Sequence, residues 1–441
     1  MQAGTQRSTP RSTPSDLTPT GSPRSKKRVK LGEADTFCIS PRKTGVVVTD
    51  PVNVLAAIIS LMGVGGSAGY YLAAAGFFEH HFNTQTLFLL MLITLYIPYP
   101  VTMLCQEAMD SRLDMIFTTR NTYFFRVILV PVMLAGIFVA YAFCSKSVPG
   151  ILVCGSGIGF LSAACMASTM QLMSAQAPHL TAWASLGRDL GGVFPVVTYW
   201  AFDFSASKAT TQEFQRMLVF PGFVLCLCAL FSTGLHCAGV WDKAYSRLSY
   251  DLSADDETGQ GLASESDPLL GDDEEVDEQG VPYWIPKWQF ANGYNTFLTF
   301  MLMPLVCFSN NPHLTQQLAL AKLLMDCLAR TAAALVAQTD AFGLHRPRHY
   351  CLIAQEILRS ALFAILLLHL LGFLAVPRHV FMCMWLLHYF DGSMVASQID
   401  ITVARFVPVA ARKGTSRRSF LANYLGLGAS LSVDVLIMFS K

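Results

Sequence analysis

Residues 52–75 read VNVLAAIISLMGVGGSAGYYLAAA, an apolar run without a charged side chain. Because an α-helix of roughly 20 apolar residues crosses the hydrocarbon layer of a bilayer, this run predicts a membrane span. Ten more runs of the same kind follow, so the sequence predicts an all-α membrane protein with eleven transmembrane helices. The predicted spans cover residues 52–75, 86–109, 124–145, 150–173, 182–204, 217–240, 290–309, 314–338, 353–376, 379–402 and 420–439.

The amino-acid composition agrees with burial in a membrane. Of the 441 residues, 53% are hydrophobic and 14% are charged, whereas about 25% of the residues in a typical soluble domain are charged. Most of the 12 cysteines fall inside the apolar runs, which favours packing over disulfides. We find no Walker loop, no paired metal ligands and no nucleophile beside a base in a known spacing. We therefore expect no enzyme activity, cofactor, metal or nucleic-acid partner.

Charge patterning divides the chain into four segments. Residues 1–50 form a basic leader with nine Lys and Arg side chains, and residues 51–241 hold spans one to six. Residues 242–288 form a loop in which Asp251–Glu278 contains twelve acidic residues and no basic one, and residues 289–441 hold the last five spans. Self-repulsion in the loop and low hydrophobicity in the leader predict that both are disordered and cytosolic.

Lys and Arg in the short loops predict the orientation. Positive residues near span ends are retained in the cytosol, and the loops on the leader's side are the richer ones. The N-terminus is therefore expected to be cytosolic and the C-terminus exofacial. The basic residues on the leader's side are Arg112, Arg120, Arg126, Arg346, Arg348, Arg405, Arg412, Lys413, Arg417 and Arg418.

The acidic loop contains a short sorting signal. Glu265, Leu269 and Leu270 fit the acidic dileucine pattern that clathrin adaptors read. This pattern favours a plasma-membrane or endolysosomal address, although chance occurrence of so short a motif remains the alternative.

Predicted span eight carries a charged stripe. Lys322, Asp326 and Arg330 are four residues apart, so they share one face of a helix, and Asp326 can neutralise both neighbours. Charged residues inside a membrane usually face the bundle interior or a water-filled path. Two interpretations follow: a salt-bridge ladder that joins helices, or a polar patch that binds a solute.

Three further spans offer polar positions. Arg188 and Asp189 lie among glycines in span five and point about 100° apart, so we expect them to have different partners. Asp391 precedes Gly392 in span ten, which predicts a local helix break lining a cavity. Tyr70 and Tyr71 follow a glycine-rich face in span one that suits either helix packing or contact with a solute.

The chain resembles the equilibrative nucleoside transporter family over nearly all of residues 50–441. Residues 325–330, read as Met-Asp-Cys-Leu-Ala-Arg, are similar to the family's eighth-helix Phe-Asp-x-x-Gly-Arg motif. Residues 187–192 (Gly-Arg-Asp-Leu-Gly-Gly) resemble its fifth-helix Gly-Gln-Gly-x-Ala-Gly segment. Residues 390–397 (Phe-Asp-Gly-Ser-Met-Val-Ala-Ser) resemble its tenth-helix Ser-Asn-Gly-Tyr-x-x-Ser region.

The resemblance implies a six-plus-five, major-facilitator-like bundle whose halves rock around a central site. It implies that Asp326 and Arg330 contact the sugar or base, with Arg188 and Asp391 at matching positions. Two departures concern the substrate. Tyr70 and Tyr71 stand where the family has Pro-Trp-Asn, and Met166 stands where it has a purine-contacting glutamine.

From these observations we expect a carrier that moves nucleosides or nucleobases by alternating access, either equilibrative or proton-linked. The alternatives are a carrier of another small polar solute, or a channel or receptor on the same scaffold. For proton coupling, Asp391 is the first candidate, because burial without a nearby cation favours the protonated carboxyl group, and Asp189 is the second. A permanent ion pair of Asp391 with Arg188 or Arg359 is the structural alternative.

Overall fold

A computed structural model describes residues 50–84, 86–202, 209–253, 281–307, 312–339, 349–407 and 409–440. Within these ranges the chain forms fifteen α-helices and one π-helical turn. Residues 1–49 of the predicted leader and the dileucine residues Glu265, Leu269 and Leu270 lie outside the described residues, so the predictions made for them stay predictions.

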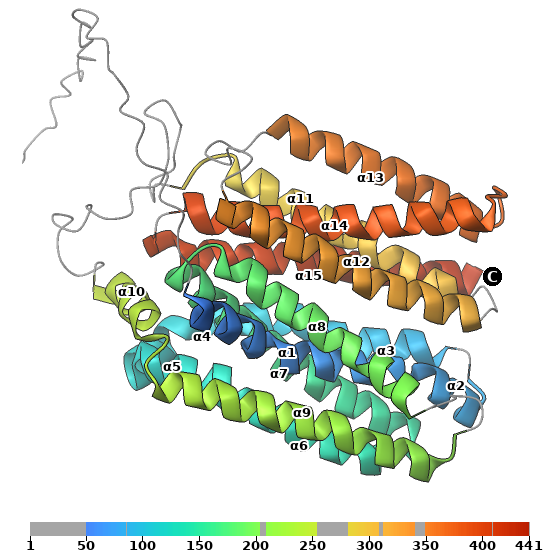
Figure 1. Cartoon of the computed structure of the whole chain (residues 1–441), viewed down its shortest axis with the longest axis horizontal. Helices are drawn as coiled ribbons and strands as arrows, with labels where there is room; N and C mark the ends of the chain where they lie inside the picture. Colours follow the sequence, from blue (N-terminus) through green and yellow to red (C-terminus); the bar gives the residue numbers. More distant parts are fainter. Residues whose placement is uncertain are drawn as a thin grey trace, which may run out of the picture. The chain divides into compact units, whose positions relative to one another are not determined.

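The helices form two groups, which separate clearly in Figure 1. In the first group, α1 packs on α8, and α6 packs on α7 and α9; in the second, α11 packs on α15 and α12 on α14. The groups meet where α8 contacts α12 and where α15 contacts α4 and α7. The first group comprises α1 (Pro51–Ala73), α2 (Ala75–Phe82), α3 (Leu87–Tyr96), α4 (Pro98–Phe117), α5 (Thr119–Phe124), η1 (Phe125–Leu129), α6 (Val130–Cys144), α7 (Val148–Gln176), α8 (Leu180–Ala201) and α9 (Thr211–Cys237). After α10 (Asp242–Ser253), the second group comprises α11 (Ile285–Cys307), α12 (Pro312–Thr339), α13 (His349–Leu370), α14 (Arg378–Phe406) and α15 (Val409–Ser440).

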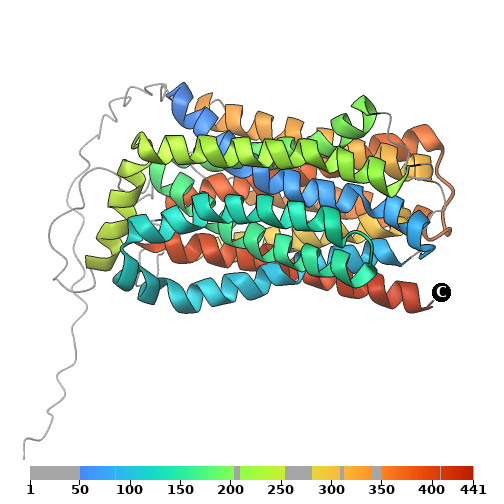
Figure 2. The ribbon, with the colours of Figure 1, turned by 90° about the horizontal axis from the view of Figure 1, so that it is seen from below.

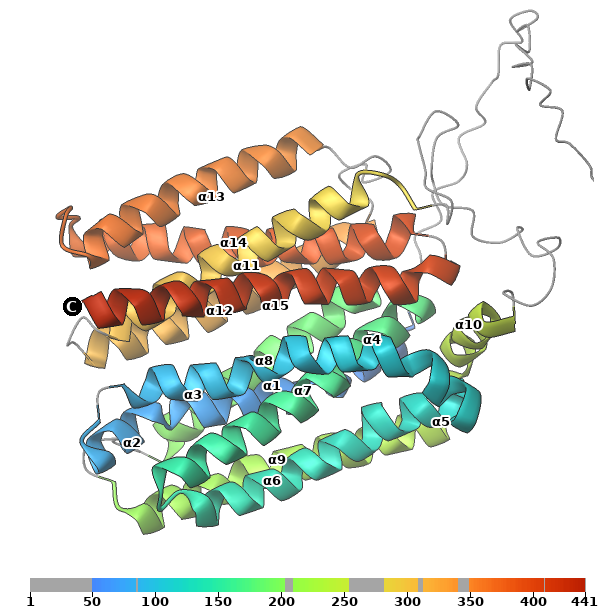
Figure 3. The same ribbon diagram turned by 180° about the vertical axis from the view of Figure 1, so that it is seen from behind.

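The long helices run roughly along one direction, as Figures 2 and 3 show from two further sides. Seven helical segments are long and apolar enough to cross a membrane: 51–82, 87–106, 119–144, 148–176, 211–237, 352–370 and 414–437. The chain is therefore a multi-pass membrane protein. Helices α8, α11, α12 and α14 are not among the seven, and three of them, α8, α12 and α14, carry the charged residues predicted to face the interior. The total of eleven spans stays a prediction.

Glycines bring α1 and α8 into backbone contact. A Cβ atom at Gly65 would overlap the backbone of Arg188, and a Cβ atom at Gly187 would overlap that of Ile58. Only glycine leaves room for so close an approach. This contact supports the packing interpretation of the glycine-rich face in predicted span one, and it fixes the position of Arg188 and of its neighbour Asp189.

Helix α10 differs from the sequence-based expectation of disorder over residues 242–288. Its apolar side buries Ala244, Tyr245 and Leu248. Arg247 donates a hydrogen bond to the backbone carbonyl of Ala175 at 2.7 Å, near the C-terminus of α7. The prediction began the disordered segment too early, because the acidic run that it rests on starts only at Asp251.

Candidate functional site

The charged stripe of predicted span eight is present on α12. Lys322 Nζ lies 2.5 Å from Asp326 Oδ2, and the hydroxyl of Ser393 on α14 donates a 2.5 Å hydrogen bond to Asp326 Oδ1. Both carboxylate oxygens of Asp326 are therefore engaged. Asp326 pairs with Lys322 but not with Arg330, so the expectation that it neutralises both neighbours is corrected.

Arg330 instead reaches across to the first helix group. Its Nε pairs with Asp189 Oδ2 on α8, and its Nη1 donates to the Ser397 hydroxyl on α14 at 3.2 Å. Asp189 Oδ1 also pairs with Arg188 Nε at 3.1 Å. The adjacent residues Arg188 and Asp189 were expected to need different partners, yet they pair with each other, because the long guanidinium side chain folds back onto its neighbour. We call the five residues Arg188, Asp189, Lys322, Asp326 and Arg330 the central ladder.

Arg188 is the most accessible member of the central ladder. Its side chain is 32% exposed, against 15% or less for the other four. Its Nη1 lies 3.8 Å from the sulfur of Met166 on α7, and the hydroxyl of Tyr424 on α15 lies 3.7 Å from the same sulfur. The structure thus brings Met166 and Arg188 together.

Aromatic rings from four helices lie beside the ladder. The ring centroid of Tyr96 is 5.7 Å from that of Tyr99 and 5.4 Å from that of Phe300, and the Tyr99 and Tyr424 centroids are 4.5 Å apart. Lys322 Nζ lies 5.9 Å from the Phe300 centroid, within cation–π range. We call Tyr96, Tyr99, Phe300 and Tyr424 the aromatic wall. Sequence reasoning missed it, because aromatic residues in apolar runs look like ordinary core.

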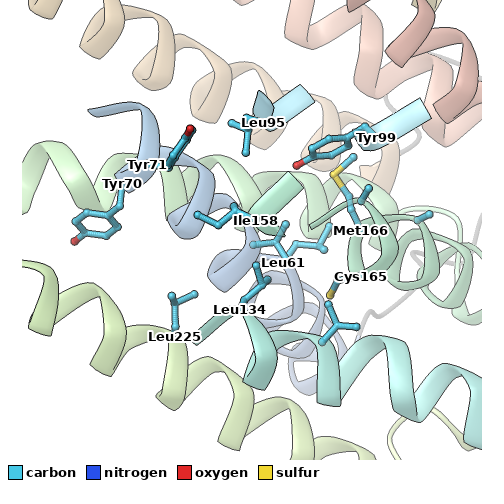
Figure 4. Close-up of a cluster of buried hydrophobic side chains, with 14 of the residues drawn as sticks. Leu61, Tyr70, Tyr71, Leu95, Tyr99, Leu134, Ile158, Cys165, Met166 and Leu225 are labelled. Atoms are coloured by element: carbon cyan, nitrogen blue, oxygen red, sulfur yellow. The ribbon is translucent and has the colours of Figure 1, made fainter. Parts of the chain in front are cut away.

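Tyr70 and Tyr71, which the sequence suggested for solute contact, lie in the packing of the first helix group. Tyr70 hydrogen-bonds Thr198 on α8, and the Tyr71 hydroxyl donates to the carbonyl of Ile151 at 3.4 Å. Both residues belong to the buried hydrophobic cluster drawn in Figure 4, which also contains Leu61 and Ile158. Neither residue contacts the central ladder.

Asp391 occupies a different environment from the ladder. Its Oδ2 has no hydrogen-bond partner among the described residues, although the side chain is buried. Helix α14 runs without interruption from Arg378 to Phe406, so the predicted break at Gly392 is absent from it. A Cβ atom at Gly392 would instead lie 2.5 Å from Cζ of Arg359, so the glycine makes room for that guanidinium group on α13.

Asp400 is a second acidic residue on α14, and sequence reasoning missed it. It follows Ser393 and Ser397 at helical spacing, on the face that carries the ladder contacts. A small cavity between the two helix groups is lined by Asp400 and by Ser174 and Thr181 from α7 and α8. The polar surface therefore continues from the ladder along α14.

A second ion-pair cluster joins the groups near their predicted cytosolic ends. Asp110 on α4 pairs through Oδ1 with Arg126 and through Oδ2 with Arg417 on α15. All three side chains are buried. Sequence analysis counted the two arginines only as orientation signals, but here they clamp α4 to α15. We call this cluster the Asp110 clamp.

Comparison with known proteins identifies the fold. No protein-family model and no curated protein matches the sequence. Among solved structures, the fold is similar to that of the Escherichia coli proton:xylose symporter XylE of the major facilitator superfamily, with TM-score 0.59, 11% identity, and coverage of 87% of this chain and 88% of that one. The human organic anion transporter MFSD10 aligns with TM-score 0.53, 15% identity, and coverage of 88% and 94%. FucP, the E. coli fucose:proton symporter, aligns in its outward conformation with TM-score 0.54, 11% identity, and coverage of 88% and 91%.

These likenesses confirm the major-facilitator-like helical fold that the sequence predicts. The proteins compared are transporters rather than enzymes. At such low identity the likeness concerns the fold, and the more specific resemblance to equilibrative nucleoside transporters stays a prediction.

Proposed function

We propose that this protein is a carrier that moves a nucleoside or nucleobase across a membrane by alternating access. The observation that carries the proposal is the central ladder, in which Asp189 of the first helix group pairs with Arg330 of the second. A solute bound at this junction touches both groups, so its binding can change how they pack against each other.

The chemistry of the site suits a flat, polar solute. The aromatic wall offers ring faces on which a base can stack, and Arg188 offers a partly exposed fork of N–H donors to base carbonyls or hydroxyls. The ladder carboxylates accept hydrogen bonds from sugar hydroxyls. XylE and FucP are named for xylose and fucose, which are polyhydroxylated solutes as a ribose is.

Alternating access requires contacts between the two helix groups that open and close as the groups rock. The Asp110 clamp ties α4 to α15 near the predicted cytosolic ends, and the Asp189–Arg330 pair ties α8 to α12 further along the bundle. Rocking of the groups must open one of these connections at a time. This arrangement favours a carrier over a continuous channel.

An organic anion is the second candidate substrate. The partly exposed guanidinium of Arg188 favours it, because arginine binds carboxylates through two parallel hydrogen bonds. MFSD10, which shares the fold, is named an organic anion transporter.

Proton linkage and cellular address are further parts of the proposal. Asp189 has two arginine partners, so it is the weaker proton candidate, and Asp391 is the stronger one. For the address we retain a plasma-membrane or endolysosomal location, with clathrin adaptors as partners of the acidic dileucine.

The test is transport by the purified full chain in liposomes. Labelled nucleosides, nucleobases, pentoses and dicarboxylates are compared for saturable uptake and for counterflow, which a carrier supports and a channel does not. We expect saturable counterflow for at least one nucleoside or nucleobase. Counterflow confined to dicarboxylates would transfer the proposal to organic anions, and unsaturable flux would refute a carrier.

A further inference from the structure

A second buried polar cluster lies within the second helix group, apart from the central ladder. It consists of Glu356 and Arg359 on α13 and of His388 and Asp391 on α14. Arg359 and His388 are fully buried, and Asp391 is 8% exposed. Arg359 lies within electrostatic range of Glu356, Asp391 and His388. We call these four residues the α13–α14 cluster.

The polar atoms of this cluster are poorly satisfied. Both carboxylate oxygens of Glu356, Oδ2 of Asp391, and Nε and Nη1 of Arg359 have no hydrogen-bond partner among the described residues. The remaining guanidinium nitrogen, Nη2, donates to the hydroxyl of Thr299 on α11 at 2.5 Å. Buried polar groups are normally paired, so such a concentration of unpaired atoms requires an explanation.

The charges do not balance. Two carboxylates and one guanidinium give the cluster a charge of −1 when His388 is neutral. An unbalanced charge buried in a membrane protein is costly. One bound proton removes the excess negative charge and gives one of the two carboxyl groups an O–H donor.

We infer that the α13–α14 cluster binds one exchangeable proton, held by Asp391 and Glu356 beside Arg359. This inference rests on the proposed carrier function, whose proton-linked form it makes specific. On release, the carboxyl O–H bond breaks, the proton passes to water and the carboxylate remains, so no oxidant or other reactant is needed. His388, one helical turn before Asp391, is the neighbouring group that can accept the proton in transit.

The groups that face the cluster from other helices fit this assignment. Helix α11 contributes the neutral side chains of Asn295 and Thr299. On α12, Asp326 lies within electrostatic range of Arg359 and already accepts from Lys322 and Ser393. On α14 itself, Tyr389 donates its hydroxyl proton to the carbonyl of Thr299 at 3.0 Å. None of these contacts supplies a positive charge that would neutralise the excess negative charge of the α13–α14 cluster.

A proton fits the cluster better than a metal ion does. Sodium and other hard cations need several oxygen ligands around one point. The guanidinium of Arg359 lies against Gly392 and within electrostatic range of both acidic residues, and it would repel a second full positive charge.

Three consecutive residues of α14 connect the cluster to the central ladder. Asp391 belongs to the cluster, Gly392 leaves room for the Arg359 guanidinium because it has no side chain, and the Ser393 hydroxyl donates a hydrogen bond to Asp326. Asn295 on α11 donates to the Gly392 carbonyl at 2.9 Å and holds this segment from the other side. Release of the proton would pull Arg359 towards the new carboxylate and thereby shift the segment that carries Ser393.

The first test reads protonation without any transported solute. Infrared difference spectra of the purified full chain are recorded across a pH step, because a protonated carboxyl group and a carboxylate absorb at separate frequencies. We expect a carboxyl band in the wild type that is lost in Asp391→Asn and in Glu356→Gln, since either change balances Arg359 without a proton. Asp434→Asn alters a separate buried carboxyl group on α15, whose two oxygens also lack a hydrogen-bond partner among the described residues, so this control can remove only a contribution of its own and should keep the band of the cluster.

Three results would overturn the inference: a band retained in both single variants, a band lost only in Asp434→Asn, or a band that responds to sodium at constant pH. The double variant Glu356→Gln/Asp391→Asn gives an independent check. It leaves Arg359 without a carboxylate, so it should melt at a lower temperature than either single variant. Equal melting temperatures would contradict the charge balance.

The second test separates proton coupling from transport. Liposomes holding wild type should accumulate the solute found by counterflow up to about tenfold per unit of imposed pH difference, if one proton moves with one solute. Asp391→Asn should lose the accumulation that the pH gradient drives, whereas Asp434→Asn keeps both this accumulation and the exchange without a gradient. Exchange without any gradient effect in wild type would refute the proton site and leave the carrier intact. If no solute is exchanged, the proposed carrier function is refuted. The proton site is then tested by the infrared spectra alone.

Discussion

Asp189 on α8 and Arg330 on α12 form a buried ion pair that joins the two helix groups. Each has a second partner: Arg188 for Asp189, and Ser397 for Arg330. The pair is therefore the centre of a network rather than an isolated bond. Removing one member leaves the other with its second partner. We therefore expect variants at this pair to affect uptake more than membrane abundance.

Arg330→Ala should abolish uptake while membrane abundance stays near that of wild type, because Asp189 keeps Arg188 as its partner. Asp326→Ala should also abolish uptake, but it leaves Lys322 without its carboxylate. Liposome uptake and detergent-extracted abundance are measured together. Normal transport in both variants would refute the assignment of the site. A collapse of abundance would instead indicate that the ladder is structural, since stranding a buried charge costs about 3–5 kcal/mol.

The Asp110 clamp predicts a stability effect at a distance from the ladder. Asp110→Ala removes the partner that Arg126 and Arg417 share, so it should destabilise the folded chain by about 3–5 kcal/mol. Asp110→Asn retains an acceptor oxygen and should lose less. Thermal unfolding in detergent compares the two variants. Equal melting temperatures in wild type and Asp110→Ala would mean that the arginines find other partners.

Much of this arrangement could be predicted from the sequence, because charges stand out in apolar runs. Lys322, Asp326 and Arg330 were visible as a stripe, and their common helix face follows from spacing alone. The sequence did not indicate which of these residues form ion pairs with one another. Which carboxylate Arg330 selects depends on the approach of α8 to α12, where a Cβ atom at Gly192 would lie 3.1 Å from the Leu323 side chain, and that is a tertiary contact.

Other parts of the site had no usable signal. Asp110 and Asp400 lie near the ends of spans, where charged residues are common, so nothing distinguished them. The role of Gly392 depends on Arg359, which lies 33 positions earlier and on another helix. Tyr96 and Phe300 become neighbours only when α3 meets α11, and each alone resembles ordinary apolar packing.

His179, in the connection between α7 and α8, predicts a dependence of stability on pH. Burial, followed by the nearby charge of Arg405, lowers the pKa of His179 from its ordinary value of 6.5. The unfolded chain therefore binds a proton at a higher pH than the folded chain does. Stability from the neutral ring is fully present above pH 6.5 and falls as the pH decreases towards the lowered pKa.

His179→Gln should remove this part of the pH dependence. Melting temperatures of wild type and variant are compared in steps from pH 8 down to pH 5. We expect the curves to run in parallel above the ordinary histidine value and to converge or cross below it. A constant difference over the whole range would assign the acid sensitivity to other groups.

The acidic dileucine predicts a change of address. Leu269→Ala/Leu270→Ala should move the protein from internal membranes to the cell surface, because adaptors require both leucine side chains. Surface biotinylation of a tagged chain measures the shift. Asp272→Asn/Asp273→Asn, in the same acidic run, is the control for altered loop charge. An unchanged distribution would mean that the motif occurs by chance.

Arg188 predicts how the site selects its solute, because it is the ladder cation most open to one. Arg188→Lys keeps the charge but loses the planar fork of N–H groups, so a solute held by two parallel hydrogen bonds should bind at least tenfold more weakly, a cost of about 1.4 kcal/mol. Arg188→Gln removes the charge as well and leaves Asp189 paired with Arg330 alone. For a neutral nucleoside the two variants should raise the KM to a similar extent, since geometry is what both lose. For an organic anion Arg188→Gln should be much the worse, since Lys still supplies the attraction. Counterflow with each solute class gives the KM values, and an unchanged KM in both variants for the transported solute would place its binding site away from Arg188.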